Sequence, residues 1–411
     1  MFRQAKIGMG GPPRGSAPLS ESIAPFRAGR RFGTVYRALL GLAVLLTALG
    51  LVLYTGESIE TAGRAAAMCM EVILPSLFPF LVVSNLIIGL GFAEAVGRIA
   101  APVMRRVFRL NGSCASVFLM GIVGGYPVGA RAAITTYEQG LCTKTECERM
   151  LSFCNNSGPA FVLGVVGTGV FADSRAGLLL YLSHVLASLT VGVLFRFYRR
   201  QEPLSRPRSL SRTPARPARV FVDAVRSGLA GVGNISAFVI FFAVAVNLLF
   251  ASGVLGTLAQ GIAAPLGHLG VNSAGVERML VGAIEMTSGL TSLKGAEAGM
   301  NARLSMAAFL LGWAGISIHC QVLSFLGDSG LSLLPYLTGK LLHAVLSAVY
   351  TALFLHFFPI AVSTAAIAAG QVEILTQMNA VACLVCALIN CACVLLAMLL
   401  LWLWDKIANR V

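Results

Sequence analysis

Long apolar runs constrain this chain more than any other feature of its sequence. Each holds about 20 residues with few charges, enough for a helix to cross a hydrocarbon core about 30 Å thick. These runs are Ala38–Tyr54, Cys69–Phe92, Ala176–Phe195, Ile235–Ala251, Leu304–Leu326 and Ala380–Trp404. Only 12% of the 411 residues are charged, whereas a soluble domain carries roughly a quarter. The sequence therefore predicts an all-α polytopic membrane protein.

The basic residues gather beside these runs and account for a net charge of +14. They fill the segment before the first run, the Pro/Ser-rich stretch Arg196–Arg226 and the end of the chain, at Lys406 and Arg410. Basic clusters flanking membrane spans mark the cytoplasmic side and favour anionic lipids. We therefore predict a multi-pass protein of the cell membrane with both termini in the cytoplasm, in contact with anionic lipids and without a nucleic-acid partner.

An internal repeat organises the chain. The motif IAAP occurs at Ile99 and again at Ile262, followed each time by an amphipathic piece ending near Asn111 or Asn272 and by an apolar arm with a polar break. Charge placement gives the first copy three crossings, so the second copy is predicted to be inverted. The predicted segments are a disordered basic tail (1–37), a first transmembrane helix (38–56), a first repeat (57–198), an Arg/Pro-rich cytoplasmic linker (199–219), an inverted second repeat (220–358) and a C-terminal transmembrane helix (378–405).

Polar residues interrupt the apolar chain at four places. Two are predicted re-entrant helical hairpins, with tips at Gly124–Pro127 and around Glu285, and two are broken helices, at Ser152–Gly167 (SFCNNSGPAFVLGVVG) and Gly312–Gln321 (GWAGISIHCQ). Unsatisfied backbone groups in hydrocarbon cost several kcal/mol each, so irregular chain survives only inside protein or beside a wet cavity. We predict that the four breaks meet around a substrate. The candidate substrate-binding residues are Gly125, Tyr126, Gly129, Asn155, Asn156, Ser157, Glu285, Thr287, Ser288, Gly289, Ser317, His319 and Gln321.

Several of these residues admit a structural role instead. Asn155 and Asn156 could cap half-helices and bind neighbouring helices, and Tyr126-Pro127 could only form a turn. Glu285 is either a functional carboxylate or a hydrogen-bonded structural group, and His319 is expected to bond to Glu285 or to relay protons. His184 and His343, each alone in an apolar helix, are predicted to be packing residues.

The sequence offers no catalytic or metal site. The ten cysteines are scattered through apolar helices and predict no disulfide framework. The chain resembles neither an HExxH zinc site, a GxSxG elbow nor a phosphate-binding loop. We therefore predict that the protein is not an enzyme, has no cofactor and binds no metal at a catalytic site, with a proton or sodium as a possible coupling ion.

Five motifs carry a resemblance to a known family. In order, ILPSLFPFLVVSNLI, GIVGGYPVGAR, FCNNSGPAFVLGVVG, EMTSGL and GISIHCQ run from about Glu60 to His356. Together they resemble YlbJ-type sporulation integral membrane proteins, which carry nucleoside-recognition (gate) domains. The resemblance implies a fold similar to concentrative nucleoside transporters, with paired hairpins and inverted repeats. It also implies a role in endospore formation, moving dipicolinic acid across the outer forespore membrane.

The function predicted from these features is secondary transport of a small polar metabolite. The substrate could be a dipicolinate-like anion or a nucleoside. An unpaired Glu285 facing a dianion would have to be protonated or bind a co-transported cation, or else recognise a nucleoside hydroxyl. The alternative is a non-transporting membrane scaffold or sensor with a nucleoside-like ligand.

Overall fold

The computed structural model describes residues 30–90, 99–201, 217–327 and 329–357. Most of the predicted basic tail, most of the Arg/Pro-rich linker and the whole predicted C-terminal helix at 378–405 lie outside these residues. The chain divides into two compact units, residues 1–49 and 50–411. The described part of the first unit is the beginning of a single helix, and the other elements belong to the second unit.

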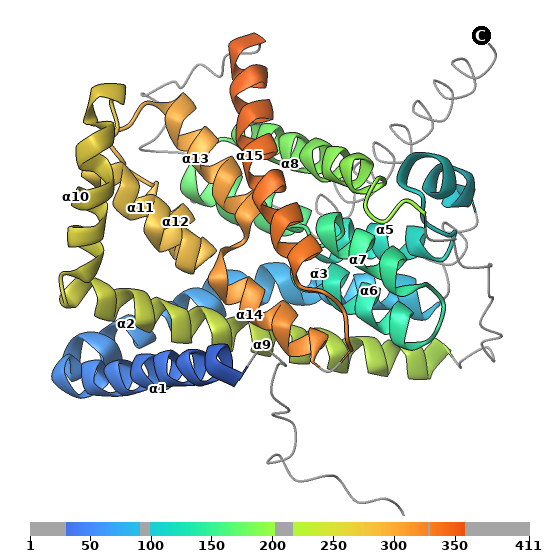
Figure 1. The fold of residues 1–411 in the computed structure, drawn as a ribbon, viewed down its shortest axis with the longest axis horizontal. Coiled ribbons are helices and arrows are strands. Elements are labelled where there is room, and N and C mark those ends of the chain that lie inside the picture. The colour runs from blue at the N-terminus through green and yellow to red at the C-terminus, as the bar shows by residue number, and fades with distance from the viewer. Residues whose placement is uncertain (1–29, 91–98, 202–216, 328, 358–411) are drawn as a thin grey trace, which may run out of the picture. The chain divides into compact units, whose positions relative to one another are not determined.

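All regular elements in the described residues are helical, which confirms the predicted all-α class. In chain order (Figure 1) they are α1 (Arg30–Leu53), α2 (Thr55–Met68), the π-helical η1 (Cys69–Ile73), α3 (Leu74–Gly89), the π-helical η2 (Met104–Phe108), α5 (Cys114–Gly124), α6 (Val128–Glu138), α7 (Lys144–Phe153), the π-helical η3 (Ala160–Val170), α8 (Ser174–Phe195), α9 (Pro217–Ala251), α10 (Val254–Leu266), the 3-10 turn η4 (Gly267–Leu269), α11 (Ser273–Ile284), α12 (Met286–Ser292), α13 (Met300–Trp313), α14 (Gly315–Leu326) and α15 (Leu334–Phe357).

Four helices of the described chain are long and apolar enough to cross a membrane. They are Ser174–Phe195, Pro217–Ala251, the broken helix Met300–Leu326 and Leu334–Phe357, and the broken pair Gly41–Leu53 and Thr55–Ile73 would make a fifth. Ser174–Phe195 and Met300–Leu326 match predicted runs to within a few residues, while α9 begins well before the predicted Ile235. The chain is an integral membrane protein.

The chain forms a π-helical turn just before Pro75. A proline lacks a backbone N–H, and its ring crowds the carbonyl four residues earlier. The wider turn η1 ends one residue before α3 starts and relieves that crowding, so the chain continues into α3 with Pro79 inside it.

Both predicted hairpins are helix–turn–helix units. In the first, α5 and α6 are joined by Gly125–Pro127; in the second, α11 and α12 are joined at Glu285. An asparagine precedes the first arm of each hairpin: Oδ1 of Asn111 accepts from Ser113 N at 2.8 Å just before α5, and Oδ1 of Asn272 caps α11 by accepting from Gly275 N at 2.7 Å.

Glycine pairs let the two arms of each hairpin touch. A Cβ added at Gly129 would lie 2.8 Å from the Cα of Gly121, and one added at Gly289 would collide with the Cα of Gly282. Backbones at this separation exclude any side chain at the crossing, as in small-residue helix contacts in membranes. The hairpins are therefore compact enough to place their tips inside the bundle.

Both predicted helix breaks are present, and each follows a hairpin. Helix α7 ends at Phe153 and η3 begins at Ala160, whereas α13 and α14 are separated by Ala314 alone. Ala314 has φ +76° and Gly315 has φ +81°, a left-handed conformation that costs a non-glycine residue about 1–3 kcal/mol. The indole of Trp313 donates to the carbonyl of Ala283 at 3.1 Å and holds this break beside the second hairpin tip.

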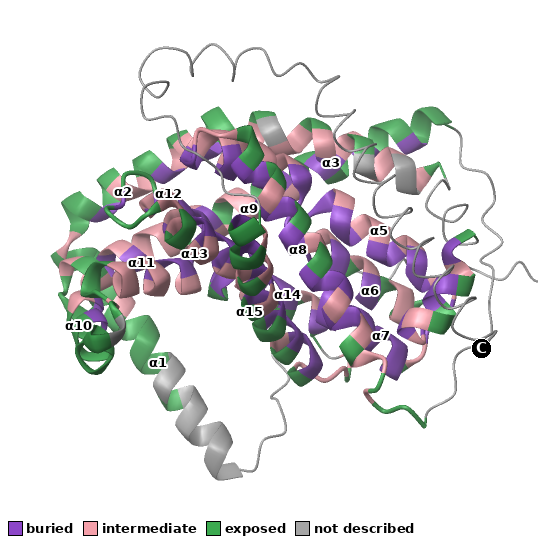
Figure 2. Cartoon of the chain, turned by 90° about the horizontal axis from the view of Figure 1, so that it is seen from above, coloured by how far each residue is buried: buried purple, intermediate pink, exposed green. Residues whose placement is uncertain are grey.

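The buried residues form one large apolar core around the first hairpin and both broken helices. Helix α7 is buried along almost its whole length, from Thr145 to Phe153, while few residues of α9 are buried (Figure 2). Helix α15 packs against α7, α8 and α13. Large exposed apolar side chains line the outer sides of α8, α9 and α15, as expected for helices in contact with lipid. The interior of the bundle thus surrounds the two breaks.

We expect Gly289→Ala to destabilise the fold, because the new methyl group would press on the backbone at Gly282 rather than on a flexible side chain. Overpacking of this kind costs about 1–3 kcal/mol, measured as a lower thermal-unfolding midpoint in detergent. Gly261→Ala is the matched control, since nothing lies within 4 Å of its added Cβ and alanine favours a helix by about 1 kcal/mol. Equal midpoints for the two variants would contradict the close contact between the hairpin arms.

Candidate functional site

A cavity lies where the two hairpin tips and the two helix breaks meet. The first hairpin and break contribute Gly125, Tyr126, Ser157 and Gly158 to its wall, and the second hairpin and break contribute Glu285, Thr287, Ser317 and Gln321. Helices α3 and α9 close the cavity with apolar side chains, among them Leu77, Leu81, Ile235 and Val239. The cavity has a volume of about 50 Å³, room for a few water molecules at roughly 10–15 Å³ each.

The candidate residues fall into two groups in the structure. Those that line the cavity are Gly125, Tyr126, Ser157, Glu285, Thr287, Ser317 and Gln321. The others are not among its lining residues: Gly129 and Gly289 pack the hairpin arms, Ser288 donates its N–H to Glu285, and Asn155, Asn156 and His319 belong to a hydrogen-bonded network behind the wall.

The cavity wall contains a buried side-chain amide, that of Gln321. Its side chain is 1% exposed, and neither its amide nitrogen nor its amide oxygen has a hydrogen-bond partner in the described protein. Oδ1 of Asn155, Oδ1 of Asn156 and Nε2 of His319 are buried in the same way. Buried polar groups are almost always hydrogen-bonded, so a polar molecule in the cavity is the natural partner for Gln321.

The carboxylate of Glu285 is already bonded to the protein. Its Oε1 accepts from Thr287 N at 3.0 Å and its Oε2 from Ser288 N at 2.6 Å, so Glu285 caps α12. The prediction of a hydrogen bond between His319 and Glu285 is wrong, because Nδ1 of His319 lies 2.9 Å from the hydroxyl of Tyr336 instead. The extended backbone at Glu285, with φ −133° and ψ 109°, turns its side chain back over the start of α12.

Sequence analysis missed the buried charge of this region, Lys340 on α15. Its side chain is 1% exposed, and Nζ donates to the hydroxyl of Tyr126 at 2.9 Å and to the carbonyl of Asn155 at 3.1 Å. The signal was present in the sequence as a single lysine inside the apolar stretch Leu333–His356. An ionisable residue within a membrane span indicates a functional site by default.

His184 and His343, predicted to be packing residues, lie next to each other in the structure. Both are buried, as packing residues would be, but their rings are 4.3 Å apart and connect α8 with α15. Ser157 donates its backbone N–H to Nε2 of His184 at 3.0 Å, and Nε2 of His343 lies 2.9 Å from the carbonyl of His184. These bonds fix both tautomers: His184 carries its hydrogen on Nδ1, and His343 carries its hydrogen on Nε2, which leaves the Nδ1 lone pair of His343 facing Lys340.

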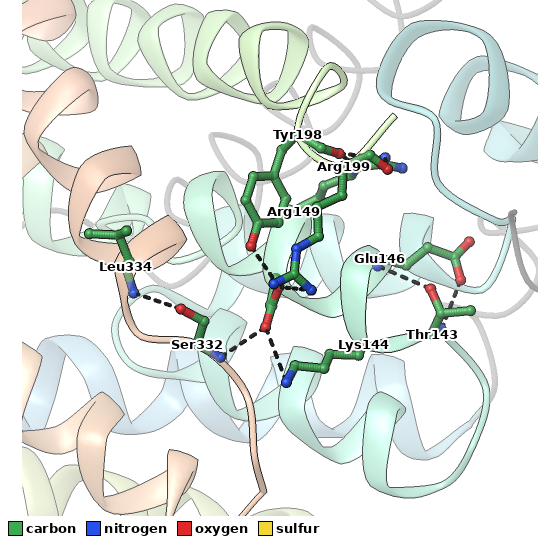
Figure 3. Close-up of polar contacts among 9 residues, drawn as sticks. Thr143, Lys144, Glu146, Arg149, Tyr198, Arg199, Ser332 and Leu334 are labelled. Carbon is green, nitrogen blue, oxygen red and sulfur yellow. Dashed lines mark hydrogen bonds and ion pairs between the residues drawn. The ribbon is translucent and has the colours of Figure 1, made fainter. Parts of the chain in front are cut away.

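A second polar cluster anchors the start of α7 away from the cavity (Figure 3). The side chain of Glu148 is fully buried and accepts from the hydroxyl of Tyr198 at 2.9 Å and from Ser332 N at 2.9 Å, with Lys144 and Arg199 as ion-pair partners at 4.0 and 3.7 Å. Arg149 donates to the carbonyls of Tyr198, Arg199 and Arg109. This cluster ties α7 to the end of α8 and to the segment before α15, the helices that carry the histidine pair and Lys340.

Comparison with known proteins agrees with this architecture. Residues 70–195 match the Gate family, described as nucleoside recognition. Over 314 residues it is 29% identical to the sporulation integral membrane protein YlbJ of Bacillus subtilis, covering 72% of this chain and 77% of that protein. The expected resemblance to YlbJ-type proteins is therefore confirmed.

The matched Gate domain contains the first hairpin, the first break and His184, while Glu285, Gln321 and Lys340 follow it in the chain. Among solved structures, a CNTnw variant in the intermediate 3 state is similar with a TM-score of 0.51 and 13% identity, covering 82% of this chain and 89% of that one. The expected similarity to concentrative nucleoside transporters is thus confirmed for the fold.

We expect Glu285→Ala to lower the thermal-unfolding midpoint in detergent, because two N–H groups at the start of α12 lose their acceptor. Loss of such a cap costs about 0.5–2 kcal/mol, whereas Glu285→Asp keeps a strong capping residue and should recover most of the stability. Glu297→Ala removes an exposed carboxylate nearby and serves as the control. If Glu285→Ala melts at the same temperature as Glu297→Ala, the capping role of Glu285 is refuted.

Proposed function

We propose that this protein is a secondary transporter that moves a small polar metabolite across the membrane through the cavity between its two hairpins. The observation that carries the proposal is the cavity wall, which takes polar residues from both hairpin tips and both helix breaks. Transport needs a buried polar site that two halves of the protein can expose to one side and then to the other. The similarity of fold to CNTnw supports the same conclusion.

The two halves are proposed to be gate-type repeats, residues 57–198 and 220–358, inserted with opposite topology. The same order of elements supports this: a hairpin, a broken helix and a long apolar helix occur as α5 to α8 and again as α11 to α15. Charge placement in the sequence favours opposite orientations, with both termini in the cytoplasm. Rocking of one half against the other around the cavity would give alternating access.

The proposed substrate class rests on the similarity to YlbJ of Bacillus subtilis and on the residues that line the cavity. The relative in Bacillus subtilis is named for sporulation, so we propose a role in endospore formation, with dipicolinate as the first candidate substrate and a nucleoside as the second. By the same resemblance, the proposed location is the outer forespore membrane. Polar residues set in an otherwise apolar wall, among them Thr287, Ser317 and Gln321, suit a small molecule that carries polar groups. The proposed activity is transport rather than catalysis.

Gln321→Met tests the proposal directly. Because the amide of Gln321 has no partner in the described protein, its replacement by an apolar side chain of similar length should leave the thermal-unfolding midpoint unchanged or slightly raised. Loss of a hydrogen bond to the substrate should reduce uptake of radiolabelled dipicolinate or uridine into proteoliposomes by about tenfold, equivalent to about 1.4 kcal/mol. Gln139→Met, at an exposed position after α6, is the matched control.

The same assay separates transport from the alternative function. A scaffold or sensor would bind a probe without moving it, so binding in detergent with no uptake by the wild-type protein would favour that alternative. Equal uptake by wild-type protein and Gln321→Met would remove Gln321 and the cavity from the transport path.

A further inference from the structure

We propose that Lys340 couples binding of an anionic substrate to uptake of one proton. This inference rests on the proposed transport function and names two properties of the same site: the substrate is an anion, and the coupling ion is a proton. On binding, a neutral Lys340 amine, a proton and the anion combine to give an ammonium paired with the anion. On release, the ammonium gives up the proton and the anion leaves, which restores the neutral amine.

The surroundings of Lys340 provide three neutral acceptors. Nζ lies 2.9 Å from the hydroxyl of Tyr126, 3.1 Å from the carbonyl of Asn155 and 3.5 Å from Nδ1 of His343. The Tyr126 hydroxyl donates its hydrogen to the carbonyl of Leu311 at 2.6 Å, so it acts as an acceptor toward Lys340. Three acceptors match the three N–H bonds of an ammonium group.

The charge of this ammonium has no counter-ion in the described protein. None of the carboxylates that form ion pairs within the described residues is within 4.0 Å of Lys340 Nζ; those pairs involve Glu60, Asp223 and Glu148. The end of α7, to which Asn155 is attached, supplies only the partial negative charge of a helix C-terminus. A buried charge without a partner is costly, so either a proton leaves or an anion arrives.

The cavity is where such an anion would bind. Tyr126 is one of the residues that line the cavity, and its hydroxyl accepts from Lys340, so the ammonium is hydrogen-bonded to a residue of the wall. Glu285, the carboxylate on the opposite wall, has both oxygens bonded to backbone N–H groups of α12 and is not directed to Lys340. In a medium of low dielectric constant, the attraction between an ammonium and an anion across this distance is substantial.

The other titratable groups near Lys340 come from every element packed around it. They are His343 and Tyr336 on α15, His184 on α8, Tyr126 between the first hairpin arms, Cys154 after α7 and His319 on α14. Ser157 N, at the cavity wall, bonds to His184, whose ring contacts His343, whose Nδ1 lone pair faces Lys340. This series of contacts connects the surroundings of Lys340 to the cavity wall.

Coupling of the two binding events is reciprocal. An anion that binds more tightly to the ammonium form also draws a proton onto Lys340, and a proton on Lys340 strengthens binding of the anion. Because the ammonium form prevails at lower pH, affinity for the anion rises as pH falls. For one coupled proton, affinity changes by up to about tenfold per pH unit.

The test is equilibrium dialysis of the full chain in detergent against radiolabelled dipicolinate or uridine from pH 6 to 9. Carboxyl groups with pKa values near 4 stay ionised over this range, so any pH dependence belongs to the protein. We expect dipicolinate affinity to fall as pH rises and uridine binding, if present, to be unaffected. Dipicolinate binding should also take up one proton per site, measured with a pH indicator in weak buffer on the wild-type protein alone.

Variants assign the effect to Lys340. Lys340→Arg stays charged across the range and should bind dipicolinate with no pH dependence, whereas Lys340→Met should bind it at least about tenfold more weakly at pH 6. Lys294→Met, at an exposed lysine of the same half, is the matched control. His319→Gln should keep the pH dependence, because His319 bonds to Tyr336 and not to Lys340.

Two results would overturn the inference. One is dipicolinate binding that is independent of pH and takes up no proton; the other is binding of uridine with no binding of dipicolinate. Either result leaves the proposed transport standing if proteoliposomes exchange a probe without an ion gradient. Absence of exchange for every probe contradicts the proposed transport itself.

Discussion

Chain that leaves its helix inside a membrane must find every hydrogen-bond partner within the protein, and the break after α7 shows how this is done. The carbonyl of Phe153 accepts from the side chains of Ser188 and Asn156 at 2.7 and 3.0 Å. The carbonyl of Asn155 accepts from Lys340, and Ser157 N donates to His184. Side chains of α8 and α15 thus provide hydrogen-bond partners for the backbone of the break. The packing of these two helices around α7 follows from that need, and so does the position of the cavity.

The second break is built differently. Ala314 and Gly315 turn the chain within two left-handed residues, and Trp313 ties that turn to the second hairpin. So short a break frees little backbone and calls for few polar partners. The titratable groups therefore gather around the first break, while the second contributes the unpartnered amide of Gln321 to the cavity. This difference places a cation behind one wall and hydrogen-bonding groups on the other, which is the arrangement that an anionic or highly polar substrate requires.

Glycines allow the first hairpin tip and the break after α7 to approach each other closely. Gly125 at the first hairpin tip has φ +73°, and a Cβ there would lie 2.9 Å from Gly158 N in the break of the neighbouring helix. Hairpin tip and broken helix therefore meet backbone to backbone, with Tyr126 directed past the contact to Lys340. A contact of this kind leaves polar backbone groups at the cavity wall without any side chain to cover them.

The sequence by itself determined the elements of this protein and where they are interrupted. Long apolar runs favour helices in a membrane, and Gly-Gly-Tyr-Pro, Asn-Asn-Ser-Gly-Pro and the glycine-containing stretch around Trp313 favour breaks, so α8, α15, both hairpins and both breaks were predictable from local chemistry. Only the tertiary structure decided which polar groups meet. The partners of Lys340 are separated from it by up to 214 residues along the chain, the histidine pair joins two helices, and Glu285 caps its own helix because of one extended residue. Such contacts depend on which helices become neighbours and on the depth of each helix in the bundle, which the local sequence of one helix does not specify.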